Sequence, residues 1–419
     1  MQETFSWTKQ WYAVHFVDEL DSKRPHALKL LGKDLVLWCD STGTWQCFED
    51  WCAHRQAPLS GGGNAGKCVR MRQPAQLRCL LPSHEAGPLA MLEAAAKKAN
   101  LTPWLSEHDD GRTPDGVPVI MLQPGFVRDF PFSQEHQLEN LSDPAHFNFV
   151  HHGMAGDMYH EAAGVANIEP VTSDEESVAA LFPGAEGVAF WVDMLMGAGR
   201  SVEHNLHHMV FPNTFTLQTF NPKDFPGADW ELLEIHTVPT EPGHVRLLVR
   251  FMMAGHSIPL MPRLASKLLP KWAAHLGAMD ITDGDTDRIT RSETQGSGRE
   301  WNKQYFMPTA SDQFAAATRK WLDTRGGGGP FPGAAPLPAL SHEQMTDRHT
   351  QHTRDCPSCS AGLHNFRALR VAAGGASIAC SGAALSNLSI TAGHSLAPVA
   401  LAAAAVAFAA VAMAAHEVV

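Results

Sequence analysis

Two histidines and a carboxylate near the middle of the chain have the types and spacing of a metal site. The run from Glu139 to His151 reads ENLSDPAHFNFVH and places His146 five residues before His151. Five residues are a little more than one helical turn, so both imidazoles can face one ion if a helix begins or bends between them. Two histidines and one carboxylate on iron leave coordination positions open for dioxygen. The alternative is a packed helix start with incidental histidines, because the run is rich in Phe and interrupted by Pro144.

A second constellation lies upstream, where Cys52 and His54 stand two residues apart in CAHRQAPLS, after a predicted strand. In a Rieske [2Fe-2S] centre one iron takes two Cys and the other two His, so a Cys-x-His pair supplies one ligand to each. A second arm, normally Cys-x-x-His, is also needed. Cys79 begins such an arm, but the run CLLPSH brings His84 two positions late. Either an omitted segment, which the intact motifs elsewhere favour, or true loss of the cluster explains this run.

Composition limits the class of protein around these residues. The 419 residues suffice for two cored domains with appendages. The formal net charge of -12 argues against a nucleic-acid partner. Eight cysteines are too sparse for a disulfide-stapled module. The opening MQETFSWTKQWYAVHF has neither signal-peptide nor transit-peptide character, so the protein stays where it is made or the sequence lacks a first segment.

The elements that must position these residues form two folded units. Residues 11–60 are predicted to be β-rich, and a helix begins at 91–105. The acidic, turn-rich stretch 106–117 marks the boundary. In the second, α+β unit, the predicted strands are 207–220, 230–239 and 244–254, and the predicted helices are 264–280 and 311–323. A Gly/Pro-rich linker, 326–338, follows.

The C-terminus is apolar. Residues 396–415 carry no charge and are long enough to span about 30 Å of hydrocarbon as a helix. Residues 371–390 are also uncharged, but they are a weaker candidate for a membrane-spanning helix because they are rich in Gly and Ser. Two short helices joined near 391–395 would form a hairpin membrane anchor, with Arg367 and Arg370 at its entry. An Ala-rich soluble helix or a low-complexity tail is the alternative.

Taken together, the motifs resemble the Rieske non-haem iron oxygenases, and within them the pheophorbide a oxygenase group with its translocon-associated and chlorophyllide a oxygenase relatives. The runs that carry the resemblance are FSWTKQWYAVHFVDELD, HALKLLGKDLVLW, CAHRQAPLS, ENLSDPAHFNFVHHG and YFMPTASDQF. The fold class implied is α+β, with a β-rich Rieske domain, a helix-grip (START-like) catalytic domain containing an antiparallel sheet, and a transmembrane helical anchor. The implied boundaries are 1–105 for the Rieske domain, 106–325 for the catalytic domain, 326–368 for a linker and 369–419 for the anchor.

The resemblance also implies roles for individual residues. Cys52, His54 and Cys79 would be cluster ligands, with His84 as the fourth unless that ligand is absent. His146 and His151 would hold a mononuclear Fe(II). The carboxylate ligand lies in DGDTD, after a helix expected to end at Ala278, and Asp285 is preferred to Asp283; an ordinary acidic turn is the alternative.

Three neighbours of the histidines have secondary roles in this interpretation. Asp143 would bridge the two centres by accepting hydrogen bonds from a cluster histidine and an iron histidine. Asn140 either lines the iron site or is a polar residue of the helix start. His152 is predicted to be a packing or supporting residue rather than a ligand.

The activity implied is a ferredoxin-dependent monooxygenase that acts on a chlorophyll-derived tetrapyrrole with O₂ as co-substrate. The implied assembly is a homotrimer, C-terminally anchored in a chloroplast membrane, envelope or thylakoid. The alternatives are a chlorophyllide a oxygenase activity, or a non-catalytic redox or translocon-associated protein that has lost the cluster.

Cys356 and Cys359 form a C-x-x-C pair beyond the catalytic core. Zinc would require a second pair, and the sequence has none. A dithiol switch addressed by thioredoxin is therefore favoured, as the resemblance also implies, over two ordinary exposed thiols.

Overall fold

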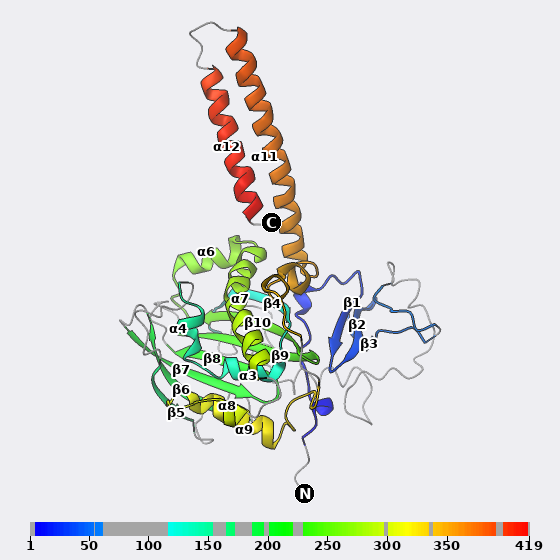
Figure 1. Cartoon of the computed structure of the whole chain (residues 1–419), viewed down its shortest axis with the longest axis vertical. Helices are drawn as coiled ribbons and strands as arrows, with labels where there is room; N and C mark the ends of the chain where they lie inside the picture. Colours follow the sequence, from blue (N-terminus) through cyan, green and yellow to red (C-terminus); the bar gives the residue numbers. More distant parts are fainter. Residues whose placement is uncertain are drawn as a thin grey trace. The chain divides into compact units, whose positions relative to one another are not determined.

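The computed structural model describes residues 5–53, 55–61, 116–153, 165–171, 187–196, 201–220, 229–296, 301–334, 338–390 and 397–417 (Figure 1). The chain divides into two compact units, residues 1–352 and 353–419. The predicted helix at 91–105 and most of the predicted boundary at 106–117 lie outside the described residues.

A three-stranded antiparallel sheet opens the first unit, with strands in the order β1 (His26–Leu30), β2 (Lys33–Cys39) and β3 (Trp45–Glu49). These strands confirm most of the predicted β-rich region. The start of the predicted β-rich region at residue 11 is wrong, because residues 10–16 form no ladder with the described residues and lead into a 3₁₀ turn at Val17–Glu19. Tyr12 and Val14 instead pack against the core beside Phe16, so burial rather than strand pairing explains the apolar run.

A larger antiparallel sheet of seven strands carries the rest of the first unit, in the order β4-β10-β9-β8-β7-β6-β5. The strands are β4 (Val119–Phe130), β5 (Val165–Pro170), β6 (Gly187–Met196), β7 (Ser201–Val210), β8 (Thr214–Phe220), β9 (Trp230–Glu241) and β10 (His244–Ala254). The three predicted strand regions are confirmed as β7 with β8, β9 and β10. The antiparallel sheet of the predicted catalytic domain is thus present.

Strand β4 was not predicted, and its breaker residues explain why. Pro124 and Gly125 interrupt its apolar pattern. Among the described strands β4 lies at the edge of the sheet, beside β10. Proline is tolerated in such an edge strand, next to a register shift opposite Val249 to Phe251. A Cβ at Gly125 would lie 2.5 Å from the ring of Phe16, so only glycine permits this packing.

Helices pack on the face of the sheet that holds the main hydrophobic core, as Figure 1 shows. They are α3 (Gln134–Leu141), α4 (His146–Val150), α7 (Lys271–Gly296) and α9 (Asp312–Thr324). The core between the layers includes Leu138, Phe190, Phe215 and Phe314. The shorter helices are α6 (Leu260–Leu268), α8 (Trp301–Gln304) and α10 (His342–Met345).

The two helices predicted in the second folded unit differ in how well they match the structure. The helix predicted at 311–323 is confirmed as α9. The helix predicted at 264–280 is two helices, since Pro270 separates α6 from α7. Its expected end at Ala278 is wrong, because α7 continues to Gly296. The DGDTD run is therefore not an acidic turn but lies inside a helix whose carboxylates bind side chains of other elements.

The second unit is a pair of helices lying side by side, α11 (Pro357–Ile390) and α12 (Ala397–Glu417). Ser377 donates a hydrogen bond to the carbonyl of Ala405, 2.8 Å away. The helices are longer than the two short ones predicted, and α11 begins directly after Cys356, so it includes only Cys359 of the C-x-x-C pair. Among the described residues one segment, Pro357–Ser386, is long and apolar enough to cross a membrane, and Val399–Val411 is a shorter apolar stretch.

Candidate metal centre

His146 and His151 are positioned by a break between two helices. Helix α3 ends at Leu141, and the hydroxyl of Ser142 bonds back to the carbonyl of Leu138 at 2.8 Å. Pro144 prevents the helix from simply continuing. Helix α4 then starts at His146, and His151 follows its last residue. The helix therefore begins at the first histidine and ends before the second, whereas a start or bend between them was expected from the sequence.

Asp285 reaches these histidines from the middle of α7. Its Oδ1 lies 3.6 Å from Nε2 of His146 and 3.6 Å from Nε2 of His151. One ligand atom from each of the three residues falls within 4.8 Å of the others. His151 is buried, and the other two are half-buried. The structure thus brings together the three residues that the sequence singled out as iron ligands.

Gly284 permits this approach of the two helices. A Cβ at position 284 would lie 3.1 Å from the carbonyl oxygen of Val150 and 3.3 Å from its Cγ1, contacts tighter than nine in ten real ones. A Cβ here would require α4 or α7 to shift by a few tenths of an ångström. The glycine between the two aspartates is therefore part of the site's construction.

A backbone contact orients the ring of His146. Its Nδ1 donates to the carbonyl of Asp143, because a carbonyl oxygen can only accept, and Nε2 is then the ring nitrogen on the side of Asp285 that a metal could use. This contact involves the carbonyl of Asp143, whereas the sequence predicted its carboxylate. Burial lowers the pKa of His151, which favours the neutral ring that a metal requires.

A polar network links the three ligands to Asp143. Asn140 donates from Nδ2 to Oδ1 of Asp285 at 3.1 Å, and Arg288 donates to the amide oxygen of Asn140. The guanidinium of Arg288 also lies 3.7 Å from Oδ2 of Asp143. Asn140 belongs to the last turn of α3, so its alternative interpretation as a helix-start residue is wrong. Arg288 was missed by sequence reasoning, although it lies one helical turn after Asp285.

The remaining polar groups of the run have other partners. Glu139 pairs with Arg319 of α9 and lies 3.4 Å from the hydroxyl of Tyr305. His152 is exposed. Asp283 binds Arg128 and Arg348, and is not among the three residues whose ligand atoms converge.

The donor set fits a non-haem iron. Two imidazole nitrogens and one carboxylate oxygen converge from two helices, and this arrangement leaves several positions of an octahedral ion to other ligands. Phe147 packs edge-on against His151, which keeps part of the surroundings apolar.

Family comparisons match both parts of this architecture. The Rieske [2Fe-2S] domain matches residues 10–81, and the vanillate O-demethylase oxygenase C-terminal domain matches residues 134–324. The chain belongs to the Rieske non-haem iron oxygenases. The second match begins at α3 and ends with α9, so it encloses all three converging ligands.

Individual relatives of this Rieske oxygenase are moderately similar over most of their length. Pheophorbide a oxygenase of Oryza sativa subsp. japonica is 28% identical, covering 90% of this chain and 77% of the relative. Flavonoid 8-hydroxylase 2 of Ocimum basilicum is 26% identical, covering 88% and 76%. The protochlorophyllide-dependent translocon component 52 of Arabidopsis thaliana is 25% identical, covering 88% and 76%. All three are named as chloroplastic proteins.

The cluster arms of this oxygenase are only partly described. Cys52 lies in the loop after β3, where its N–H donates to the carbonyl of Ala57 at 2.8 Å and its carbonyl accepts from Gln56 at 2.7 Å. His54, Cys79 and His84 lie outside the described residues. The domain match ends at residue 81 and so includes Cys79 but not His84.

His207 of β7 is a further imidazole near the candidate metal centre that sequence reasoning missed. It is buried, and within the described part of the chain neither ring nitrogen has a hydrogen-bond partner. Burial lowers the pKa of His207 to about 3, so the ring is neutral. In the sequence His207 was only the first residue of the predicted strand 207–220, which gave no indication of a role.

Cys356 and Cys359 are buried rather than exposed, so the alternative of two ordinary exposed thiols is wrong. Cys359 lies in the first turn of α11, and Cys356 directly precedes the helix, where its carbonyl accepts from the N–H of Ser360 at 2.9 Å. Neither is in a disulfide.

Proposed function

We propose that this Rieske oxygenase is a ferredoxin-dependent monooxygenase of the pheophorbide a oxygenase type, acting on a chlorophyll-derived tetrapyrrole. The convergence of His146, His151 and Asp285 is the observation that carries the proposal. The two domain matches and the relative from rice support it. The proposed boundaries remain 1–105, 106–325, 326–368 and 369–419.

The proposed roles of the residues follow from their contacts. His146, His151 and Asp285 would hold Fe(II), which when bound supplies the activation of O₂. Asn140 orients the Asp285 carboxylate through its 3.1 Å hydrogen bond. Arg288 partly neutralises Asp143 and keeps it turned toward the site.

Electron supply is the second part of the proposal. Cys52, His54, Cys79 and His84 would hold the [2Fe-2S] cluster, which when bound supplies electrons taken one at a time from ferredoxin. Asp143, with 31% of its side chain exposed, is accessible to a cluster histidine of a neighbouring subunit in the proposed homotrimer. The relationship to other Rieske oxygenases supports this arrangement.

Two other functions remain as alternatives. A different planar substrate, such as chlorophyllide a or a flavonoid, is favoured by the similarity to flavonoid 8-hydroxylase 2. A non-catalytic, translocon-associated role is favoured by the CLLPSH run and by the similarity to translocon component 52.

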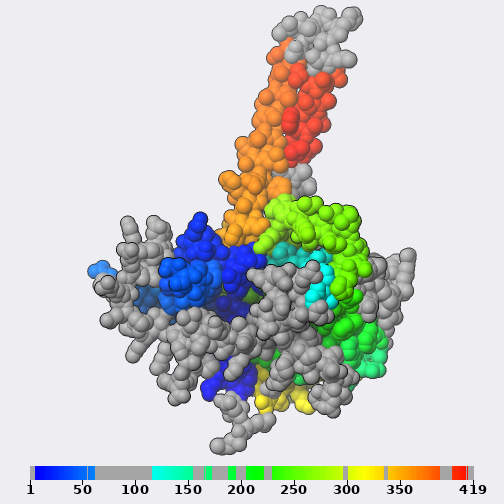
Figure 2. Space-filling view, turned by 180° about the vertical axis from the view of Figure 1, so that it is seen from behind, coloured from blue at the N-terminus to red at the C-terminus, as the bar shows by residue number. Residues whose placement is uncertain are grey.

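We also propose a chloroplast membrane as the location. The chloroplastic relatives and the apolar helix Pro357–Ser386 support it. Helix α6 adds support from the first unit, where Leu260, Met261 and Leu268 are 66%, 74% and 74% exposed. The same helix carries Arg263 and Lys267 and no acidic residue, a combination typical of helices that lie in the surface of an anionic bilayer. The surface over these residues is yellow-green in Figure 2.

The C-x-x-C pair is proposed as a dithiol switch that thioredoxin addresses. Two buried thiols three residues apart, one just before α11 and one in its first turn, support a paired role.

Two measurements separate these functions. The anaerobically reduced protein should give a Rieske EPR signal; iron bound without that signal would contradict the enzyme and favour the non-catalytic role. With reduced ferredoxin and ¹⁸O₂, the protein should incorporate label into pheophorbide a rather than chlorophyllide a or a flavone. Incorporation into a flavone alone would overturn the tetrapyrrole assignment.

A further inference from the structure

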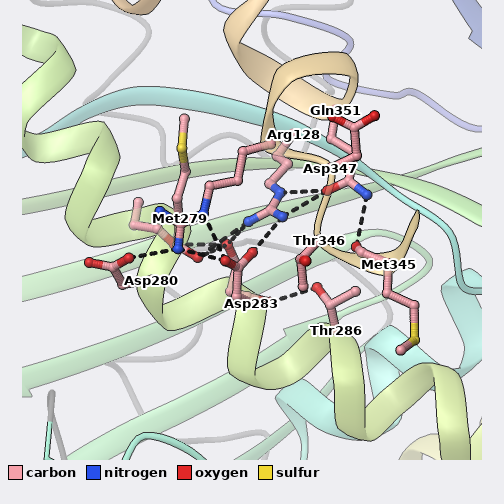
Figure 3. Close-up of polar contacts among 12 residues, drawn as sticks. Arg128, Met279, Asp280, Asp283, Thr286, Met345, Thr346, Asp347 and Gln351 are labelled. Carbon is pink, nitrogen blue, oxygen red and sulfur yellow. Dashed lines mark hydrogen bonds and ion pairs between the residues drawn. The ribbon is translucent and has the colours of Figure 1, made fainter. Parts of the chain in front are cut away.

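Arg128 is a fully buried arginine that binds the helix carrying Asp285 (Figure 3). It projects from β4, and its side chain is 0% exposed. Nη1 donates to the hydroxyl of Thr282 at 2.8 Å and to the carbonyl of Met279 at 3.3 Å, both on α7. Nη2 donates to Oδ1 of Asp283 at 2.6 Å. A guanidinium is costly to bury, so all of these bonds are needed to compensate its lost hydration.

Asp283 is held from a second direction by the segment 338–352. Arg348 donates from Nε to Oδ2 of Asp283 at 2.7 Å, and from Nη2 to Asp280 at 2.7 Å. One carboxylate thus lies between two guanidinium groups, one from β4 and one from this segment.

Gln351 fixes the segment against Arg128. Its Oε1 accepts from Nη2 of Arg128 at 2.7 Å and from Nε at 3.1 Å, while its Nε2 donates to the carbonyl of Met345 at 2.8 Å. Figure 3 shows these groups gathered around the guanidinium of Arg128. The segment 338–352 therefore completes the hydrogen bonding of the buried Arg128 guanidinium and, through Arg348, binds two aspartates of α7.

The ion pairs of Asp283 lie on the side of α7 opposite the candidate metal ligand Asp285. Residues 283 and 285 are two positions apart on a helix, about 200° around its axis, so their side chains leave on nearly opposite sides. Asp283 faces the two arginines, and Asp285 faces His146 and His151. Any rotation or shift of this turn would move both carboxylates together.

We propose that Arg128 and Arg348 are positioning residues for Asp285. By holding Asp283 on both oxygens they fix the turn of α7 that presents Asp285 to the two histidines, and they make metal binding depend on the segment 338–352. The inference rests on the proposed function, because it requires that His146, His151 and Asp285 bind a metal.

The test measures metal affinity in the full chain. After the mononuclear iron is removed, Co(II) is titrated and its binding is followed by the d–d absorption that reports coordination geometry. Arg348→Ala should weaken Co(II) binding by roughly 10- to 100-fold, the usual effect of removing a group that supports a ligand, and should alter the spectrum. Arg291→Ala is the matched control: it removes an exposed arginine of α7 whose partner, Asp287, is one turn away, and should leave both readouts unchanged.

The possible outcomes are distinct. If Arg348→Ala lowers the melting temperature of the metal-free protein but binds Co(II) as tightly as the wild type, the positioning role is overturned. Asp283→Asn, which keeps the shape of the side chain, should weaken Co(II) binding in the same direction if Arg348→Ala does not fold. If wild-type Co(II) binding does not depend on His146, the proposed metal site itself fails, and the positioning role fails with it.

Discussion

At the scale of single residues, the candidate metal centre depends on Gly284 as much as on its ligands. The contact between α4 and α7 is close enough that a methyl group at position 284 would meet backbone atoms of Val150. His151 follows Val150 directly, so a displaced α4 would move a ligand. Gly277, on the same helix, has nothing within 4 Å of a hypothetical Cβ.

We therefore expect opposite effects from two identical substitutions. Gly277→Ala should stabilise the protein by about 0.5–1 kcal/mol, because alanine is the better helix former. Gly284→Ala should lose that gain and weaken metal binding, since the helices must separate. Chemical denaturation and Co(II) titration of both variants check this, and equal metal affinity in the two would contradict it.

The ligand assignment gives a second residue-scale expectation. His146→Ala should abolish iron at the mononuclear site without disturbing the cluster, because Cys52 belongs to a separate sheet region. Iron content and the EPR spectrum of the reduced protein measure the two centres independently. His152→Ala, at an exposed neighbouring position, is the control and should change neither. A His146→Ala protein that still oxygenated a pigment would refute the assignment.

The candidate ligands could be predicted from the sequence, but the residues that hold them in position could not. The five-residue spacing of His146 and His151 is local, so it could be recognised directly. Asp285 was chosen from a resemblance, because nothing in its own neighbourhood distinguishes it from Asp283. Arg128 and Arg288 could not be found, since each acts through partners that only the tertiary fold brings near.

At the scale of elements, the local sequence pattern predicted a strand correctly where the apolar residues of the pattern are also the buried ones. Strands β9 and β10 follow their apolar runs closely. Helix α7 was misjudged because its Asp-Gly-Asp sequence is typical of a turn, while the pairing of Asp283 with Arg128 and Arg348 stabilises the helix there. Tertiary contacts outweighed local propensity in this case.

Helix α6 gives an expectation at the same scale. A nitroxide label at Leu264, in the full chain reconstituted into vesicles containing anionic lipid, should be shielded from water-soluble relaxation agents and accessible to oxygen. A label at Lys320, on the exposed side of α9, should remain water-accessible. Replacing Arg263 and Lys267 by Glu should reduce the immersion of the Leu264 label. A label at Leu264 that stays in water in the unmodified protein would rule out lipid contact.

At the scale of the whole molecule, several histidines of the first unit are buried or half-buried and neutral. Burial lowers the pKa of His15 and His208 to about 4, and that of His136 and His207 to about 3. In the unfolded chain each returns to about 6.5. The unfolded state therefore binds more protons than the folded state between pH 3 and 6.5, and the stability of the folded state falls as the pH is lowered through that window.

Acid sensitivity is thus an expected property of the metal-free protein. The free energy of unfolding should be highest above pH 6.5 and should decline toward pH 4. His207→Leu should flatten this decline by up to about 1.4 kcal/mol for each pH unit, the contribution of one histidine. His256→Gln, at an exposed position, is the control. Urea denaturation at pH 7, 6, 5 and 4 measures the slopes, and identical slopes for the wild type and His207→Leu would refute the explanation.

The metal ligands and the residues of the segment 338–352 that hold α7 are far apart along the chain, and this separation has a consequence for biosynthesis. Asp285 emerges from the ribosome 139 residues after His146, and Gln351 emerges later still. A nascent chain that has made both histidines, and even Asp285, still lacks the arginine and glutamine that hold the third ligand in place. On the proposed positioning role, a metal can be bound tightly only after the segment 338–352 has been synthesised, so metal loading of this centre follows translation of that segment.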